Sequence, residues 1–172
     1  MSEPTIPAPR GASDILSSAL DEMAREECGI FGITGVDSVA ELTFQGLYAL
    51  QHRGQESAGI CAIDRDGTAR MRKGLGLVAD VFSADDLNDL PGTTGVGHVR
   101  YSTAGGSRPQ NAQPILVRYA QGDLSIAHNG NLTNAQELRD WLVDEGALFQ
   151  TTSDSEVIVH LIARSRYDTV EA

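Results

Sequence analysis

The chain has 172 residues, of which 41% are hydrophobic and 22% are charged, a composition typical of a globular domain. Its formal net charge of −11 argues against nucleic acid or an anionic membrane surface as a partner, because both need a basic face. No apolar run approaches the roughly 20 residues that span a bilayer. Its two cysteines, Cys28 and Cys61, exclude a disulfide framework and a CxxC metal site. We therefore expect one cytoplasmic domain.

Residues 1–27 differ in composition from the rest of the chain. We expect a disordered tail over 1–13, which contain proline and serine, and a weak helix over the acidic residues 14–27. The folded domain is expected over residues 28–172, so that 1–27 form a leader that precedes it.

From residue 28 onward, the hydrophobic pattern predicts short strands around a few helices. The expected elements are, in chain order, a strand over 30–33, a helix over 38–51, strands over 58–63 and 69–73, a short acidic helix from 83, strands over 96–101, 115–119 and 124–128, and helices after 133 and 153. Asp64–Gly67 predicts a hairpin turn, and Thr133–Gln136 and Ser153–Glu156 have the spacing of capping boxes. The strands and helices do not alternate in a βαβ order, which favours antiparallel sheets covered by helices.

Cys28 stands at the junction between the leader and the first expected strand. The simpler interpretation is a small buried hydrophobe, which is what most free cysteines are. The alternative is a nucleophile. Removal of the leader would give Cys28 a free α-amine, with an ordinary pKa of about 7.7–8.0, that could serve as the base for its own thiol. Cys61 lies in an apolar strand, and we interpret it as a core residue.

Arg100 and Asp154 are candidates for binding a charged substrate. Arg100 ends an expected strand, where an arginine is usually solvated, although its guanidinium could grip a carboxylate through two parallel hydrogen bonds. Asp154 stands in the first turn of the last expected helix, where complementarity to the helix dipole is the simpler interpretation. It could instead receive a substrate ammonium group.

Two further pairs of residues follow expected elements. Asn129 and Gly130 form an Asn-Gly pair, which is common in hairpin turns. The next expected element is a helix, however, and both residues could donate hydrogen bonds to one oxyanion. Gly54 fits the stop of the first helix, and Arg53 is either a cation of its last turn or a substrate contact.

Six short motifs, taken in order, resemble the glutaminase domain of class II glutamine amidotransferases, which are N-terminal nucleophile hydrolases. The motifs are Cys28-Gly-Ile-Phe-Gly-Ile, Leu50-Gln-His-Arg-Gly-Gln-Glu-Ser-Ala-Gly59, Gly97-His-Val-Arg-Tyr-Ser-Thr103, Asn111-Ala-Gln-Pro114, His128-Asn-Gly-Asn131 and Thr152-Ser-Asp-Ser-Glu156. Each motif alone is weak, but the ordered set is specific. The implied fold is α+β, a four-layer αββα sandwich of two antiparallel sheets, and we expect this chain to be truncated at its C-terminus.

The resemblance implies that Cys28 is the catalytic nucleophile once its α-amine is free, and that residues 1–27 are a propeptide removed by autocatalytic cleavage. Its thiol would attack the side-chain amide of glutamine, form a glutamyl thioester and release ammonia. Asn129 and Gly130 are implied as the oxyanion hole. While the Glu27–Cys28 bond is intact, we expect an inactive form, because an amide nitrogen is a poor base.

The same resemblance implies how glutamine is held. Arg100 would clamp the α-carboxylate, and Asp154 would accept the α-ammonium with help from Thr103. Arg53 and Gly54 would form the pocket beside the nucleophile. A zwitterion held at both ends accounts for selectivity toward glutamine.

Within the family, His52 and Tyr101 favour the branch that aminates phosphoribosyl pyrophosphate, because glucosamine-6-phosphate synthases typically have tyrosine and tryptophan at these places. The ammonia would then pass to a phosphoribosyltransferase domain absent from this chain, giving phosphoribosylamine in the first step of de novo purine biosynthesis. One alternative is another class II amidotransferase, such as a glucosamine-6-phosphate synthase type. The other is an unprocessed, non-catalytic fragment that binds glutamine.

The resemblance also bears on cofactors and partners. For the full-length enzyme it implies Mg²⁺, a homo-oligomer and, as in many leader-bearing members, a 4Fe–4S cluster whose ligands lie outside this chain. We expect no metal in the present segment, because metal-ligand spacing is lacking among the scattered histidines His52, His98 and His160.

Overall fold

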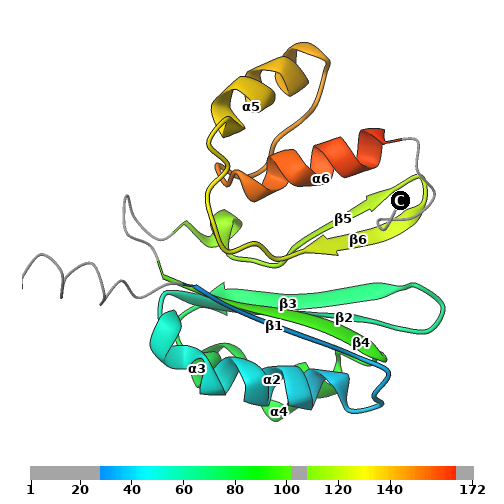
Figure 1. The fold of residues 1–172 in the computed structure, drawn as a ribbon. Coiled ribbons are helices and arrows are strands. Elements are labelled where there is room, and N and C mark those ends of the chain that lie inside the picture. Colours follow the sequence, from blue (N-terminus) through cyan, green and yellow to red (C-terminus); the bar gives the residue numbers. More distant parts are fainter. Residues whose placement is uncertain (1–27, 102–107, 166–172) are drawn as a thin grey trace, which may run out of the picture.

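The structure is a computed structural model that describes residues 28–101 and 108–165. The proposed leader, Thr103 and residues 166–172 lie outside the described residues. Within them, the elements form four layers in space: helices, a four-stranded antiparallel sheet, a two-stranded antiparallel sheet, and helices again (Figure 1). This arrangement confirms the αββα sandwich expected from the sequence.

The four-stranded sheet has the strand order β1-β4-β2-β3. Its strands are β1 (Gly29–Thr34), β2 (Ser57–Ile63), β3 (Ala69–Leu75) and β4 (Thr94–Arg100). The β2–β3 pair is the hairpin predicted from the turn sequence, with Gly67 at a φ of 83°. Gly29 pairs with Val99 and Ser57 with Arg100, so the start of β1, the start of β2 and the end of β4 meet at one end of the sheet.

Helices cover the outer face of this sheet (Figure 1). They are α2 (Val39–Ala49), α3 (Val78–Val81) and α4 (Ala84–Asn88), and the 3-10 turn η1 (Gln51–Arg53) follows α2. The core between helices and sheet contains buried apolar side chains that include Val39, Leu47, Ile60, Val78 and Val99. Removal of such surface from water, at about 25 cal/mol per Å², is the main force that holds the two layers together.

The second half of the molecule contains the smaller sheet and the upper helices. Its elements are η2 (Pro109–Asn111), β5 (Ile115–Tyr119), β6 (Gly122–Ile126), α5 (Ala135–Asp144) and α6 (Ser155–Arg164). β6 begins and ends two residues earlier than expected, because Gly122, at a φ of 119°, turns the chain directly into the strand.

The two predicted capping boxes are wrong. α5 begins after Asn134 without a side-chain cap, and Thr133 lies outside the helix. α6 begins after Asp154, also without a side-chain cap. The buried Glu156 carboxylate accepts hydrogen bonds from the N–H groups of Gln150 (2.8 Å) and Thr151 (2.7 Å) in the preceding loop. The Glu156 side chain therefore bonds to the preceding loop in place of the main chain of Ser153.

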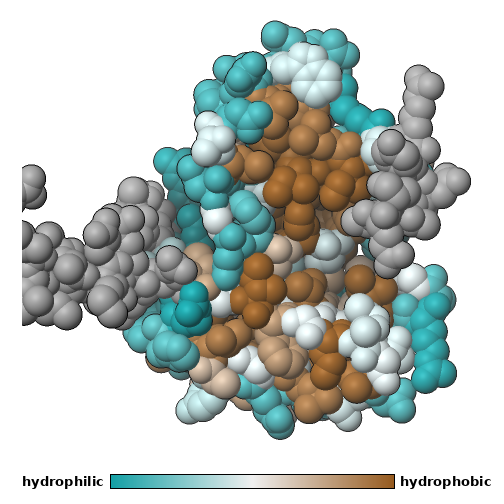
Figure 2. Space-filling model, viewed as in Figure 1, coloured by the Kyte–Doolittle hydropathy of each residue, from teal (hydrophilic) through white to brown (hydrophobic). Residues whose placement is uncertain are grey.

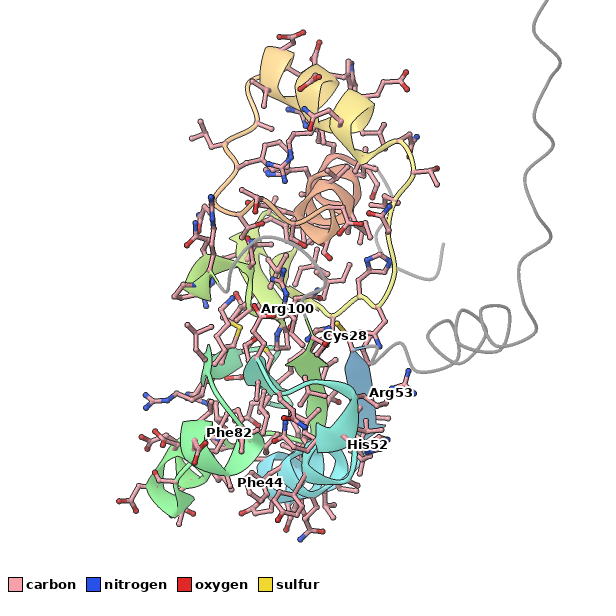
Figure 3. The ribbon with its side chains drawn as sticks, turned by 90° about the vertical axis from the view of Figure 1, so that its left-hand side faces the viewer. Cys28, Phe44, His52, Arg53, Phe82 and Arg100 are labelled. Carbon is pink, nitrogen blue, oxygen red and sulfur yellow. The ribbon has the colours of Figure 1, made fainter. Side chains whose placement is uncertain are left out.

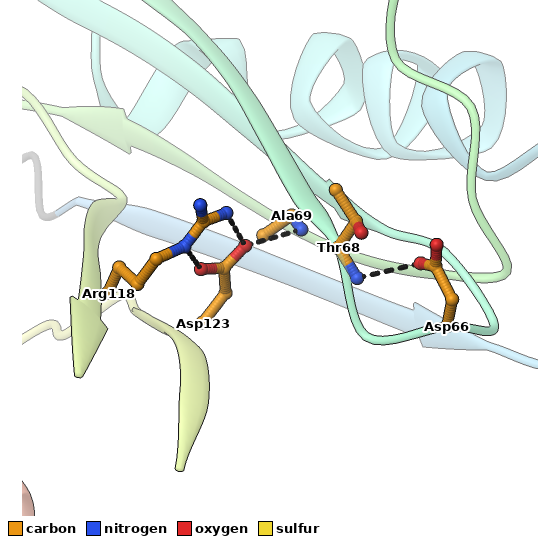
Figure 4. A network of polar contacts seen from close by, with 5 residues as sticks. All are labelled: Asp66, Thr68, Ala69, Arg118 and Asp123. Carbon is orange, nitrogen blue, oxygen red and sulfur yellow. Dashed lines mark hydrogen bonds and ion pairs between the residues drawn. The ribbon is translucent and has the colours of Figure 1, made fainter. Parts of the chain in front are cut away.

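One polar network joins the two sheets (Figure 4). Asp123 of β6 accepts hydrogen bonds from Arg118 of β5, at 2.6 and 3.0 Å, and from the N–H of Ala69 at the start of β3, at 2.9 Å. The Arg118 and Ala69 hydrogen bonds lower the pKa of Asp123 from 3.8 to about 2. The side chain is therefore an anion that links the small sheet to the large one. Asp66, also shown, accepts from Thr68 within the hairpin loop.

The outer layer of the second half is partly apolar at its surface. Val143, Leu148 and Leu161 are large exposed hydrophobic side chains of this part of the chain. The upper half of the face in Figure 2 carries a continuous hydrophobic area in the region of α6. Across residues 28–101 and 108–165, no helix has both the length and the hydrophobicity to cross a membrane.

Candidate active site

Cys28 lies directly before β1, at the end of the large sheet where β4 also ends. Its Sγ is 3.4 Å from the main-chain N–H of Tyr101 and 3.5 Å from the Tyr101 carbonyl oxygen. The residue is half-buried, whereas Cys61 is fully buried, as predicted. Burial raises the pKa of the Cys61 thiol, so Cys28 is the thiol that is accessible to a substrate.

Two distant side chains converge on the main chain of Cys28. Asn129 Nδ2 donates to the Cys28 carbonyl at 2.6 Å, and Arg53 Nε donates to the same oxygen at 3.3 Å. Figure 3 shows Cys28 with Arg100 on one side and Arg53 on the other. Sequence reasoning singled out all four residues, and the structure brings them to one end of the large sheet.

Gly54 follows the last residue of η1, as expected of a helix stop, but it lacks the left-handed conformation that favours glycine there. Its φ of −157° is extended backbone that any residue adopts. A Cβ at this position would lie 2.7 Å from main-chain atoms of Val99 and Arg100. Glycine is therefore needed because the loop after η1 packs directly against the end of β4, the strand that carries Arg100.

Asn129 and Gly130 follow β6 and do not form a hairpin turn. Gly130 has a φ of 146°, which favours glycine, and an added Cβ would lie 3.0 Å from Nε2 of His128. The chain then runs through a loop into α5. This geometry presents the Asn129 amide toward Cys28 at the end of the strand.

A polar cavity of about 720 Å³ lies beside this end of the sheet, and both Arg100 and Asp154 line it. The volume falls in the range of about 300–1,000 Å³ that is typical of small-molecule sites. Arg100 Nη1 donates to the carbonyl of Asn111 at 2.7 Å, which fixes the guanidinium at the cavity wall. An arginine and a carboxylate on the walls of one cavity can bind a zwitterion at both of its charged groups.

Asp154 is held by its own contacts. One carboxylate oxygen accepts from the N–H of Leu132 at 2.8 Å, and the other lies 3.4 Å from the hydroxyl of Ser155. Asn111 makes two hydrogen bonds to Thr152, of 2.8 and 3.0 Å, and so fixes the loop that precedes Asp154. Sequence reasoning assigned no role to Asn111, although its motif carried the family resemblance.

His98 is a second residue to which the sequence assigned no role. It lies on β4, fully buried, and neither ring nitrogen forms a hydrogen bond with a residue that the structure describes. Burial lowers the pKa of His98 from 6.5 to about 4, against a smaller opposing effect of the Asn129 side chain. A neutral imidazole therefore lies next to the Asn129 amide at neutral pH.

The site does not fit a metal or a cluster. Among the described parts of the chain, no group of three or more His, Cys, Asp or Glu side chains could hold a metal ion. The whole chain has two cysteines, while a 4Fe–4S cluster is held by four thiolates.

Comparison with known proteins identifies the family of the chain. Residues 98–172 match the family described as "Glutamine amidotransferase domain". An amidophosphoribosyltransferase of Lacticaseibacillus casei is 54% identical over 140 residues, which cover 81% of this chain and 72% of the relative. The enzyme of that name from Bacillus subtilis is 48% identical over 147 residues, which cover 85% of this chain and 31% of the relative.

Solved structures agree in fold. A structure described as "the allosteric regulatory enzyme of purine biosynthesis" has a TM-score of 0.77 at 47% identity. A B. subtilis glutamine phosphoribosylpyrophosphate amidotransferase, complexed with ADP and GMP, has a TM-score of 0.74 at 45% identity. Each comparison covers 83% of this chain and 30% of the solved chain.

The fold and the match define a glutamine amidotransferase domain. At 54% identity over most of a relative's length, the chain belongs to the amidophosphoribosyltransferase family. It corresponds to the N-terminal, glutamine amidotransferase part of that family, and spans about 30% of the solved relatives.

Proposed function

We propose that this chain is the glutaminase part of an amidophosphoribosyltransferase, with Cys28 as the nucleophile. The observation that carries the proposal is the convergence on Cys28 of Tyr101, Arg53 and Asn129, beside a cavity that an arginine and a carboxylate line. Residues 1–27 are proposed to be a propeptide, and residues 28–172 the glutaminase domain. Cleavage of the Glu27–Cys28 bond frees the α-amine that the reaction needs as a base.

The proposed reaction begins when the Cys28 α-amine takes the thiol proton and Sγ attacks the side-chain carbonyl carbon of glutamine. The Asn129 amide and the N–H of Gly130 donate to the oxyanion that forms. The tetrahedral intermediate collapses to a thioester, and the amide nitrogen accepts the proton and leaves as ammonia. Water then attacks the thioester, releases glutamate and restores the thiol.

Substrate selection follows from the cavity. Arg100 is proposed to bind the α-carboxylate and Asp154 the α-ammonium, with Thr103 as a further contact to the ammonium group. Arg53 and Gly54 are proposed to form the pocket beside the nucleophile, outside the wall of the cavity that Arg100 and Asp154 line. The distance between the charged ends and the thiol then selects glutamine over shorter amides.

The whole enzyme is proposed to use the ammonia in a phosphoribosyltransferase domain outside this chain. There it would convert phosphoribosyl pyrophosphate to phosphoribosylamine, the first step of de novo purine biosynthesis, in a homo-oligomer. The relatives support this proposal, since their name describes that activity. A cytoplasmic location stays a prediction, and some relatives are named as chloroplastic.

Intact-mass measurement with an electrophilic glutamine analogue tests the proposal. We expect loss of residues 1–27 and one adduct, absent in a Cys28→Ala variant and retained in a Cys61→Ala variant, which removes the buried cysteine instead. A chain that starts at Met1 yet hydrolyses glutamine would contradict the role of the α-amine. An adduct that persists in Cys28→Ala would contradict the assignment of the nucleophile.

A further inference from the structure

The side chain of Gln113 makes a pair of hydrogen bonds to the residue that precedes the proposed oxyanion donors. Gln113 Oε1 accepts from the main-chain N–H of His128 at 2.7 Å, and Gln113 Nε2 donates to the His128 carbonyl at 3.1 Å. The side chain is 7% exposed. One buried amide therefore satisfies both main-chain groups of His128, and leaving such groups unpaired is unfavourable.

The register of the small sheet explains this pair. Ile115 pairs with Ile126, so the same register extended by two residues places Gln113 opposite His128. A continuing antiparallel ladder would join these two residues through their main chains. The Gln113 main chain leaves the ladder, and its carbonyl instead lies against β2, 2.1 Å from where a Cβ of Gly59 would be. The side-chain amide takes the place that a strand partner would occupy.

The segment that carries Gln113 is itself held in place. Lys73 Nζ donates to the carbonyls of Ala112 and Pro114, at 2.6 and 3.2 Å, on either side of Gln113. Desolvation lowers the pKa of the half-buried Lys73. These contacts anchor the segment to β3 of the large sheet. The amide of Gln113 is therefore presented from a rigid support.

The position of His128 determines the positions of Asn129 and Gly130. Asn129 follows His128 directly, and its Nδ2 reaches the Cys28 carbonyl at 2.6 Å. Gly130 follows at a φ of 146°, with the His128 ring against it. A change in the His128 peptide would therefore rotate both groups away from Cys28. A misplacement of about 1 Å at such a site can cost about 100-fold in rate.

We propose that Gln113 is a positioning residue that sets the orientation of Asn129 and Gly130 by pairing with the main chain of His128. This inference rests on the proposed function, because it concerns the groups assigned to the oxyanion hole. Gln113 is absent from the wall of the cavity that contains Arg100 and Asp154. Its loss should therefore reduce turnover of bound glutamine and leave the affinity for glutamine largely unchanged.

The substitution Gln113→Glu separates positioning from simple packing, since it preserves size and changes only hydrogen bonding. A neutral carboxyl group can accept from the His128 N–H and donate to its carbonyl, as the amide does. The ionised form has no donor and repels the carbonyl. Gln113→Met keeps the length of the side chain and loses both hydrogen bonds at every pH. Gln110→Glu, at an exposed position three residues earlier, is the matched control.

The test measures kcat and KM for glutamate formation in the full-length protein across pH, relative to wild type at each pH. For Gln113→Glu we expect a kcat about 100-fold below that of wild type near neutral pH and a KM within about threefold of the wild-type value. The ratio of its kcat to that of wild type should rise toward one as pH falls. The kcat of Gln113→Met should stay low at every pH. The kcat ratio of Gln110→Glu to wild type should be near one and should not change with pH. A flat ratio for Gln113→Glu, or a loss carried by KM, would overturn the inference.

A measurement without catalysis keeps this test separate from the proposed function. Hydrogen exchange of a peptide spanning residues 127–131 should be faster in Gln113→Met than in wild type and unchanged in Gln110→Glu. Unchanged exchange in Gln113→Met would overturn the inference whatever the activity. If Cys28→Ala retained wild-type glutaminase activity, the proposed function would fail, and the exchange result would still decide whether Gln113 holds the segment.

Discussion

Arg100 and Asn111 are joined by a 2.7 Å hydrogen bond from the guanidinium to the main-chain carbonyl, which ties the end of β4 to the turn η2. Asn111 in turn holds Thr152 through two side-chain hydrogen bonds. One residue thus connects the strand that carries Arg100 with the loop that leads to Asp154. The two charged groups of the cavity are therefore placed by a common support.

Replacement of Arg100 by lysine should weaken glutamine binding. A lysine ammonium cannot make the bond to Asn111 and also grip a carboxylate at two points. Lysine keeps the positive charge but loses at least one hydrogen bond to a charged group, which is worth about 1.5–3 kcal/mol, so KM should rise about tenfold or more. The measurement is glutamate formation against glutamine concentration. Arg70→Lys, on the exposed side of β3, is the control, and equal KM values for the two variants would contradict the role of Arg100.

Replacement of Gly54 by alanine should destabilise the protein. Its Cβ would lie 2.7 Å from main-chain atoms of β4, which cannot move aside as a flexible side chain could. Such overpacking costs typically about 1–3 kcal/mol, and here it also displaces Arg100. Urea denaturation should show the loss in the free energy of unfolding. Gly32→Ala on β1 is the control, because its nearest atom is 4.0 Å away; similar losses in both variants would refute this explanation.

Local signals in the sequence predicted most of the fold. The Asp64–Gly67 turn and the alternation around it specify the β2–β3 hairpin without help from the rest of the chain. The Ser153–Glu156 capping box failed because Glu156 is buried and accepts from two main-chain N–H groups of the loop before it. The motif predicts a carboxylate in the first turn of the helix, but it does not show which main-chain donors that carboxylate meets.

The site was predicted in part. Ordered motifs indicated Cys28 and Arg100, but glycine at position 54 was explained by the wrong cause, since a close approach between distant segments has no local signal. The roles of Gln113 and His98 were missed for the same reason. Both are polar residues that become fully or nearly buried, and only the folded chain reveals which groups they meet.

Buried His98 should make the protein less stable in mild acid. Its pKa is about 4 in the folded state against 6.5 when exposed, so between these values the unfolded chain binds a proton that the folded chain does not. The free energy of unfolding therefore falls as pH drops through this window, by about 2 kcal/mol between about pH 7 and pH 5.

The variant His98→Phe removes this titration and keeps a buried ring. Its unfolding free energy, measured by urea denaturation at both pH values, should decline less than that of wild type. Arg100 and His128 contribute charges near the ring in both proteins, so the difference between the two declines reports His98. Parallel declines would refute the prediction.

The ion pair that links the two sheets should also stabilise the protein in a pH-dependent way, but at a lower pH than His98. Arg118 and Ala69 hold the pKa of Asp123 at about 2, below its ordinary 3.8. The folded chain therefore releases this proton more readily than the unfolded chain, so the stabilisation is complete above about pH 4 and is lost as pH falls toward 2. Asp123→Asn should lower the melting temperature near neutral pH, and the gap from wild type should narrow in acid. Asp89→Asn, which changes an exposed carboxylate of the same type, should leave the melting temperature nearly unchanged; an equal decrease in both variants would show that the bridge to β3 does not stabilise the sandwich.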